Sequence, residues 1–167
     1  MTVILGIDPG SRITGYGLVK DTGSTLVYLD SGCIRTTDGQ LSQRLLEIFD
    51  GICELMETYK PNEVAIENVF FHQNPSTALK LGHARGAAMV ACASHRILVS
   101  EYSPREIKQS VVGYGAAEKD QVKAMIMRVL MLSHPPKTDA SDALAAAVCH
   151  SYVRKNLMLK RKVLGSN

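Results

Sequence analysis

The chain opens on two short runs of β-forming residues separated by a tight turn. Residues 3–7 are apolar and stop at Asp8, Pro9-Gly10 follows, and a second run covers residues 14–19. An Asp-Pro-Gly sequence between two such runs is typical of a β-hairpin. A carboxylate at the end of a buried strand needs a partner, and the sequence must be searched for one.

The hydrophobic period then changes along the chain. A third β-rich run covers residues 25–36, and apolar residues at helical spacing follow over residues 45–59, ending before Pro61. Residues 63–67 predict a short buried strand. Because a helical crossover precedes this strand, we expect it to lie parallel to the first one, with the carboxyl ends of the two strands side by side.

The second half continues with helices and one more strand. Asn74 is placed to cap a long helix that extends to about His95, and residues 97–102 predict the last strand. Pro104 then opens a short helix, since proline is favoured in a first helical turn.

Two more helices complete the pattern. The first has an apolar stripe made of Val122, Met125, Ile126 and Val129. Lys119 and Lys123 lie together on another face of it, and the Pro135-Pro136 pair is expected to end it. The last helix is predicted over residues 138–153.

These elements predict one α/β domain. Three antiparallel strands followed by alternating helices and strands give a mixed five-stranded sheet with helices on both faces. We place the domain at residues 1–154 and interpret residues 155–167 as a flexible basic tail. With no apolar stretch of about 20 residues and no signal peptide, we expect a cytoplasmic protein with no membrane contact.

Composition adds two constraints. The four cysteines form no CxxC pair, so we interpret them as small buried residues in a reducing compartment rather than zinc ligands. The net charge is only +3, but residues 101–167 carry 11 Lys and Arg against 6 Asp and Glu. A basic half of this kind suits a polyanionic partner.

Four carboxylates are the candidate chemistry. Asp8 and Glu67 end the two strands expected side by side, and Asp139 and Asp142 share one face in the first turn of the last helix. Taken singly, each has an ordinary explanation as a turn residue, a solvated strand end or an anion at a helix N-terminus. None of these explanations predicts that acids from distant segments converge. The expected strand order, in contrast, does bring them together.

A converged cluster of acids needs countercharge. Two unit charges about 5 Å apart repel by about 3 kcal/mol at an effective dielectric of about 20. Oxygen ligands with no suitably spaced His or Cys favour Mg²⁺ or Mn²⁺ over zinc. A pair of such ions can activate a water and stabilise the leaving oxygen in phosphodiester hydrolysis. The sequence therefore predicts that the partner of Asp8 is a metal ion.

The segments that carry this chemistry resemble the RuvC family of bacterial Holliday-junction resolvases, in the ribonuclease-H-like superfamily. They are LGIDPGSRITGYGL, SGCIRT, AIENVF, STALKLGHARG, IKQSVVG, AEKDQV and TDASDALA, and in this order they span nearly the whole chain. The resemblance implies a ribonuclease-H-like fold and a homodimeric, Mg²⁺-dependent endonuclease with two ions per subunit, for which Mn²⁺ can substitute. It further implies paired symmetric nicks in four-way junction DNA, in recombination and repair, and a RuvA–RuvB branch-migration complex as partner.

Residue by residue, the resemblance implies which side chains carry out the reaction. The catalytic and metal-binding acids correspond to Asp8, Glu67, Asp139 and Asp142. Some family members have a histidine at the third of these positions, so an all-carboxylate version is implied here. Phe70 resembles a residue that inserts against bases at the junction centre, while Lys108 and Lys119 resemble DNA contacts near the scissile phosphate. Lys123 is a further DNA-binding candidate, although a solvated helix face explains the Lys119 and Lys123 pair equally well without the resemblance.

Two glycines inside the long central helix bear on assembly. Gly82 and Gly86 each cost about 1 kcal/mol relative to alanine in a helix, so we expect another element to approach closely there. The sheet or a second subunit would satisfy this expectation. We favour a dimer interface, because two nicks at a symmetric junction require two active sites.

Three other functions remain open on the sequence alone. An actin-like or sugar-kinase ATPase also opens on a strand, an acid and a glycine turn, but it needs two related domains. A nuclease-like fold that only binds DNA would lack one or more of the four candidate acids, and all four are present. A related nuclease that cuts RNA–DNA hybrids would share the site chemistry and differ only in its binding surface.

Overall fold

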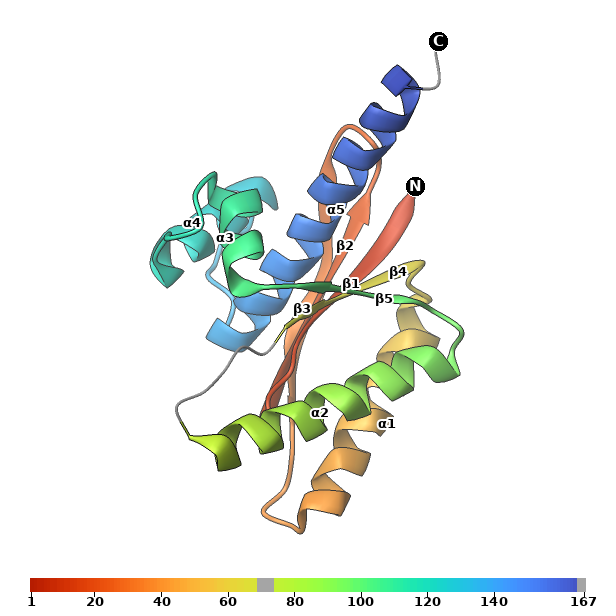
Figure 1. The fold of residues 1–167 in the computed structure, drawn as a ribbon, viewed down its shortest axis with the longest axis vertical. Helices are drawn as coiled ribbons and strands as arrows, with labels where there is room; N and C mark the ends of the chain where they lie inside the picture. Colours follow the sequence, from red (N-terminus) through yellow and green to blue (C-terminus); the bar gives the residue numbers. More distant parts are fainter. Residues whose placement is uncertain (69–73, 165–167) are drawn as a thin grey trace.

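The computed structural model describes residues 1–68 and 74–164, which fold into one five-stranded sheet with helices on both faces (Figure 1). The strands are β1 (Thr2–Asp8), β2 (Ile13–Asp21), β3 (Leu26–Arg35), β4 (Glu63–Glu67) and β5 (Val99–Tyr102). Their order is β3-β2-β1-β4-β5, with β1 antiparallel to β2 and parallel to β4. The predicted fold class and the parallel placement of β4 are confirmed.

The helices form two layers. α1 (Leu41–Tyr59) and α2 (Pro75–Ser94) cover one face of the sheet, and α5 (Thr138–Leu164) crosses the other (Figure 1). α3 (Pro104–Val112) and α4 (Lys119–Val129) pack beside α5 in the same core cluster. None of the described helices is long and apolar enough to cross a membrane.

Local signals set the helix starts where the sequence predicted them. The Asn74 side chain accepts a hydrogen bond from the Ser76 N–H at 3.0 Å, which caps α2. Ser103 and Glu106 form a reciprocal capping box at the start of α3. These caps hold the helices that flank the carboxyl ends of β4 and β5.

The end of α4 differs from the expectation. The helix ends at Val129, ahead of the Pro135-Pro136 pair. Met131 adopts a left-handed backbone conformation with φ 54°, so the chain leaves the helix before the prolines are reached.

The length of α5 is a second correction. The helix continues to Leu164 instead of ending near residue 153, so most of the expected tail is helical. Arg154 and Lys155 at its midpoint form ion pairs with Asp21 of β2, and Arg154 also pairs with Glu63 of β4. These contacts tie the helix to the sheet, while its last turns extend past the sheet (Figure 1). The flexibility expected of residues 155–167 stays a prediction.

The closest packing in the fold joins α5 to the first two strands at three glycines. A Cβ atom on Gly6 would lie 2.0 Å from the Ala143 carbonyl oxygen. One on Gly15 would lie 2.1 Å from the Asp139 carbonyl oxygen, and one on Gly17 would meet the same helix at 2.7 Å. The helix therefore rests directly on the strand backbone.

The two helical glycines behave differently. A Cβ atom on Gly82 or Gly86 would meet nothing within 4 Å. No described part of the chain approaches α2 at these two glycines, which excludes the sheet, the alternative to a second subunit. Approach by a second subunit stays a prediction.

Cysteine burial follows the prediction in part. All four cysteines are free; Cys92 and Cys149 are buried, whereas Cys33 and Cys53 are only half-buried.

A glycine-to-alanine substitution in β1 tests how tightly α5 packs against this strand. We expect Gly6→Ala to lower the free energy of unfolding by about 3 kcal/mol, because the new Cβ collides with helix backbone that cannot rotate away. Gly39→Ala is the control, since its Cβ would meet side-chain atoms of Gln43 and Thr37 and no backbone. Urea denaturation measures both, and an equally small loss in the two variants would show that α5 moves away from the sheet easily.

Candidate active site

The carboxyl ends of β1 and β4 form one corner of the sheet. The ladder pairs Ile7 with Ile66, so Asp8 and Glu67 occupy the next positions of adjacent strands. Side chains alternate between the two faces of a strand, which places both acids on the face covered by α5. The start of α5 adds Asp142, and the three carboxylates line one cavity of about 260 Å³.

The walls of this cavity come from three helices. Besides the three acids, the cavity is lined by Pro104, Ile107, Lys108, Lys119, Val122 and Ala145. The apolar members of this set surround the carboxylates with a medium that solvates charge poorly. The two lysines, one from α3 and one at the start of α4, supply its only positive charge among the described residues.

Asp139 stands beside this cavity rather than in it. Its backbone packs against Gly15, which pairs with Asp8 in the β1–β2 ladder. Its charge still reaches Asp8 and contributes to the raised pKa of that carboxyl. The four acids predicted from the sequence are therefore brought together, with three lining the cavity and Asp139 at its border.

The electrostatic state of Asp8 follows from this crowding. Burial, and next the negative charges of Glu67 and Asp142, raise the pKa of Asp8 from 3.8 to about 8. Burial and the charge of Asp142 also raise the pKa of Glu67. Interaction with Asp8 lowers the pKa of Glu67, against the larger effect of burial, so a proton on this pair is held more strongly by Asp8. The crowded carboxyls oppose their own ionisation, which is the electrostatic cost that the sequence predicted.

Asp142 has a different partner. The Lys119 ammonium group donates a hydrogen bond to Asp142 Oδ2 at 3.0 Å. This bond and the charge of Asp142 raise the pKa of Lys119. The Lys119 side chain is 73% exposed, so it can also contact a group that enters from solvent.

The other predicted DNA-binding residues are distributed unevenly. Lys108 lines the cavity, and its charge lowers the pKa of Glu67, against the larger effect of burial. Lys123 lies one turn beyond Lys119 on α4 and does not line the cavity. Phe70 lies outside the described residues.

The turn after Asp8 is fixed by its own contacts. The Thr14 hydroxyl donates to the Gly10 carbonyl oxygen at 2.9 Å. A Cβ on Gly10 would lie 2.1 Å from the Ile13 carbonyl oxygen. Glycine is required here because the tight turn leaves no room for a Cβ atom.

The donor set fits a hard divalent cation. In residues 1–68 and 74–164, no three His, Cys, Asp or Glu side chains are already arranged as ligands of one ion. The cavity nevertheless offers only carboxylate oxygens as anionic donors, and these are in excess of its positive charge. Oxygen donors of this kind are the ligands that Mg²⁺ and Mn²⁺ prefer.

Sequence reasoning missed the residues that shape the site without reacting. Ile107 and Val122 make the cavity apolar, and the alternating glycines of ITGYGL let α5 approach. The glycine spacing was a usable signal, because glycine at alternate positions leaves one face of a strand without side chains.

Comparison with known proteins adds a family. Residues 4–150 match the family model described as crossover junction endodeoxyribonuclease RuvC. A protein of that description from Legionella pneumophila is 64% identical over 167 residues, covering 99% of this chain and 94% of the relative. One from Tolumonas auensis is 53% identical over 158 residues, covering 95% and 91%.

A solved structure is similar over nearly the same extent. It is described as T. thermophilus RuvC in complex with Holliday junction substrate. The TM-score is 0.88 at 31% sequence identity, with 93% of this chain and 96% of that chain covered.

The raised pKa of Asp8 predicts a pH-dependent stability. Folded Asp8 keeps its proton up to about pH 8, whereas the unfolded group releases it near 3.8, so the free energy of unfolding falls as pH rises between these values. In EDTA, we expect Asp8→Asn to remove most of this decrease and to raise Tm at pH 8 by about 5 °C or more. Asp120→Asn, an exposed acid on α4, is the matched control. An unchanged pH slope in Asp8→Asn would contradict the assignment.

Proposed function

The chain belongs to the RuvC family of crossover junction endodeoxyribonucleases, and from this premise we propose that it resolves four-way DNA junctions by paired, symmetric strand cleavage. The observation that carries the proposal is the cavity at the ends of β1 and β4, where Asp8, Glu67 and Asp142 meet. An ordinary surface does not gather buried like charges, and metal-assisted phosphodiester hydrolysis uses such a cluster to hold its ions.

We propose that Asp8, Glu67, Asp139 and Asp142 are the catalytic acids and that they hold two Mg²⁺ ions per subunit, with Mn²⁺ as a substitute. When bound, the ions neutralise the carboxylates, activate a water and stabilise the leaving oxygen. Asp8 must lose its proton to serve as a ligand, since the proton and the ion compete for the same oxygens. The apolar walls from Ile107 and Val122 restrict bulk water around the reacting phosphate.

The lysines are proposed to hold the DNA strand. Lys108 and Lys119 stand at the cavity from two different helices, so a phosphate entering between them meets positive charge from both. Lys123 extends this charge along α4 by one turn and is proposed to contact a neighbouring phosphate. Phe70 is proposed, from the family resemblance alone, to stack on a base at the junction centre.

A second copy of the chain is proposed to pack on α2. Leu79 and Val90 are 64% and 60% exposed, and they follow the helical spacing of Gly82 and Gly86 along one side of the helix. Open glycines between exposed apolar side chains let two such helices approach closely. An isologous dimer would present two cavities to the two-fold symmetric junction.

Two wider assignments rest on the family resemblance. We propose the RuvA–RuvB branch-migration complex as a functional partner, because it moves the junctions that a resolvase cuts. We propose a cytoplasmic location on the same basis, because the family's substrate arises in bacterial chromosomal recombination and repair.

A cleavage assay on three substrates tests the function. With Mg²⁺, we expect paired nicks at symmetric positions in a mobile four-way junction, and little cutting of a linear duplex or an RNA–DNA hybrid. Asp142→Asn should lower the rate by about 100-fold or more, because it removes a ligand oxygen, whereas Asp120→Asn should not. Preferential cutting of the hybrid would reassign the substrate, and junction binding without cutting would leave only a binding function.

Sedimentation tests the proposed dimer. We expect Val90→Asp to convert the dimer to monomer and to replace paired nicks with single ones, because a charge is forced into an apolar interface. Met131→Asp is the control, since Met131 is 90% exposed and lies away from α2. A Val90→Asp protein that stays dimeric would place the interface elsewhere.

A further inference from the structure

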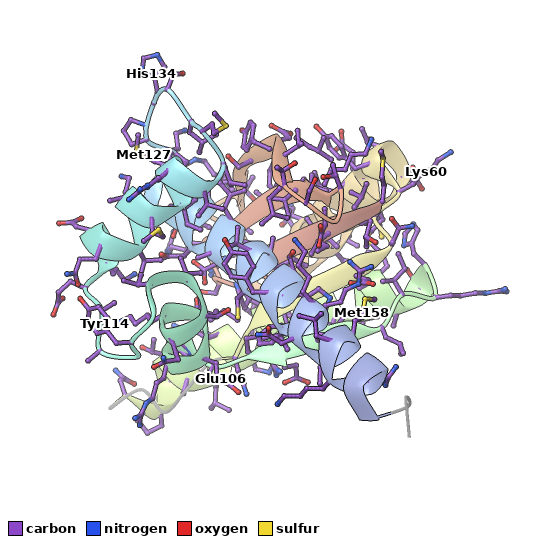
Figure 2. The ribbon with its side chains drawn as sticks, turned by 90° about the horizontal axis from the view of Figure 1, so that it is seen from above. Lys60, Glu106, Tyr114, Met127, His134 and Met158 are labelled. Atoms are coloured by element: carbon purple, nitrogen blue, oxygen red, sulfur yellow. The ribbon has the colours of Figure 1, made fainter. Side chains whose placement is uncertain are left out.

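A groove that shares no lining residue with the carboxylate cavity lies along the C-terminal half of α5. It has a volume of about 550 Å³ and runs between the segment that leads into β5 and the C-terminal half of α5. Glu63 begins β4 in this groove and Glu67 ends the same strand in the cavity, so about 13 Å of strand separates the two. Figure 2 views this end of the molecule, with Met158 labelled beside α5.

The groove is apolar along both sides. Leu98 stands before β5 with 91% of its surface exposed, and Leu157 and Met158 of α5 are 54% and 48% exposed. Large apolar side chains gathered along one groove are the usual anchors for an amphipathic segment of a partner. The unbranched Met158 side chain can adapt to such an anchor.

The charge along the groove is positive. Arg96 and Arg161 line its rim, are exposed, and form no ion pair with any side chain that the structure describes. The one acid in the groove, Glu63, is already bound by Arg154 at 3.1 Å and by His150 at 2.8 Å. An incoming acidic group therefore meets free guanidinium groups rather than a competing carboxylate.

The floor of the groove is preorganised. His150 Nδ1 lies 2.7 Å from the Tyr102 hydroxyl, and its other ring nitrogen bonds Glu63. Arg154 joins Glu63 to Asp21, which also accepts a hydrogen bond from Ser151 at 2.7 Å. Both sides of the groove are thereby fixed to the sheet before any ligand arrives, which lowers the entropic cost of binding.

We propose that this groove docks an acidic amphipathic segment of a protein partner, with its apolar side chains on Leu98, Leu157 and Met158 and its carboxylates on Arg96 and Arg161. Nucleic acid would use the arginines but would leave the exposed leucines in water. The exposed apolar surface therefore favours a protein segment.

The test uses a fluorescently labelled helical peptide with leucines on one face and glutamates on the other, and the full chain as receptor. We expect saturable binding by anisotropy, at least tenfold weaker in Leu98→Asp and in Arg161→Glu, and weaker in high salt. Met131→Asp matches Leu98→Asp in exposure and should bind as the parent does. Circular dichroism checks that all variants fold, and junction cleavage should be unchanged in each.

Four binding results would overturn the proposal. These are no saturable binding, binding that the groove variants do not weaken, equal binding of a peptide with lysines in place of glutamates, and a parallel loss of junction affinity in Leu98→Asp. The last result would make the groove a DNA surface. A change of oligomeric state in Leu98→Asp would assign the groove to a second copy of the chain and would overturn it too.

Discussion

Direct contact between α5 and the bare backbone of β1 and β2 determines where the rest of the site lies. Gly6, Gly15 and Gly17 have no side chains, so the helix rests on the strands themselves. At this distance its first turns reach the corner where Asp8 and Glu67 end their strands. α3 and α4 pack against α5 in turn, and their lysines arrive at the cavity through that packing.

The same contact holds several carboxylates close together, which is electrostatically unfavourable. Three carboxylates are held in a partly apolar cavity, and one of them binds a proton well above its ordinary pKa. Lys119 forms an ion pair with Asp142, while burial raises the pKa of both Asp8 and Glu67. Native proteins accept such local destabilisation where function needs it, and the apolar clusters on the two faces of the sheet supply the compensating stability.

The sequence predicted those features that depend on local or pairwise rules. The hairpin at Pro9-Gly10, the parallel placement of β4 and the helix start at Asn74 each follow from turn chemistry, crossover topology or capping, and each is confirmed. The convergence of Asp8 and Glu67 followed from strand order alone.

Features set by distant segments escaped prediction. The C-terminal half of α5 is fixed by ion pairs between Arg154 and the acids Asp21 and Glu63, which lie far away in the chain. The role of a glycine is equally hard to predict from sequence. A missing Cβ allows close packing, but the sequence does not show which element, if any, packs there. Gly17 proved to be a packing position, whereas Gly86 meets nothing within the described chain.

The place of α5 in the chain has a consequence for biosynthesis. Asp139 and Asp142 follow every strand of the described sheet in the sequence. The first hairpin and β4 can therefore emerge from the ribosome before these two residues are synthesised. A nascent or truncated chain that lacks α5 therefore has only two of the four acids that we propose as catalytic. Until that helix emerges, the face of β1 that it covers stays open to water.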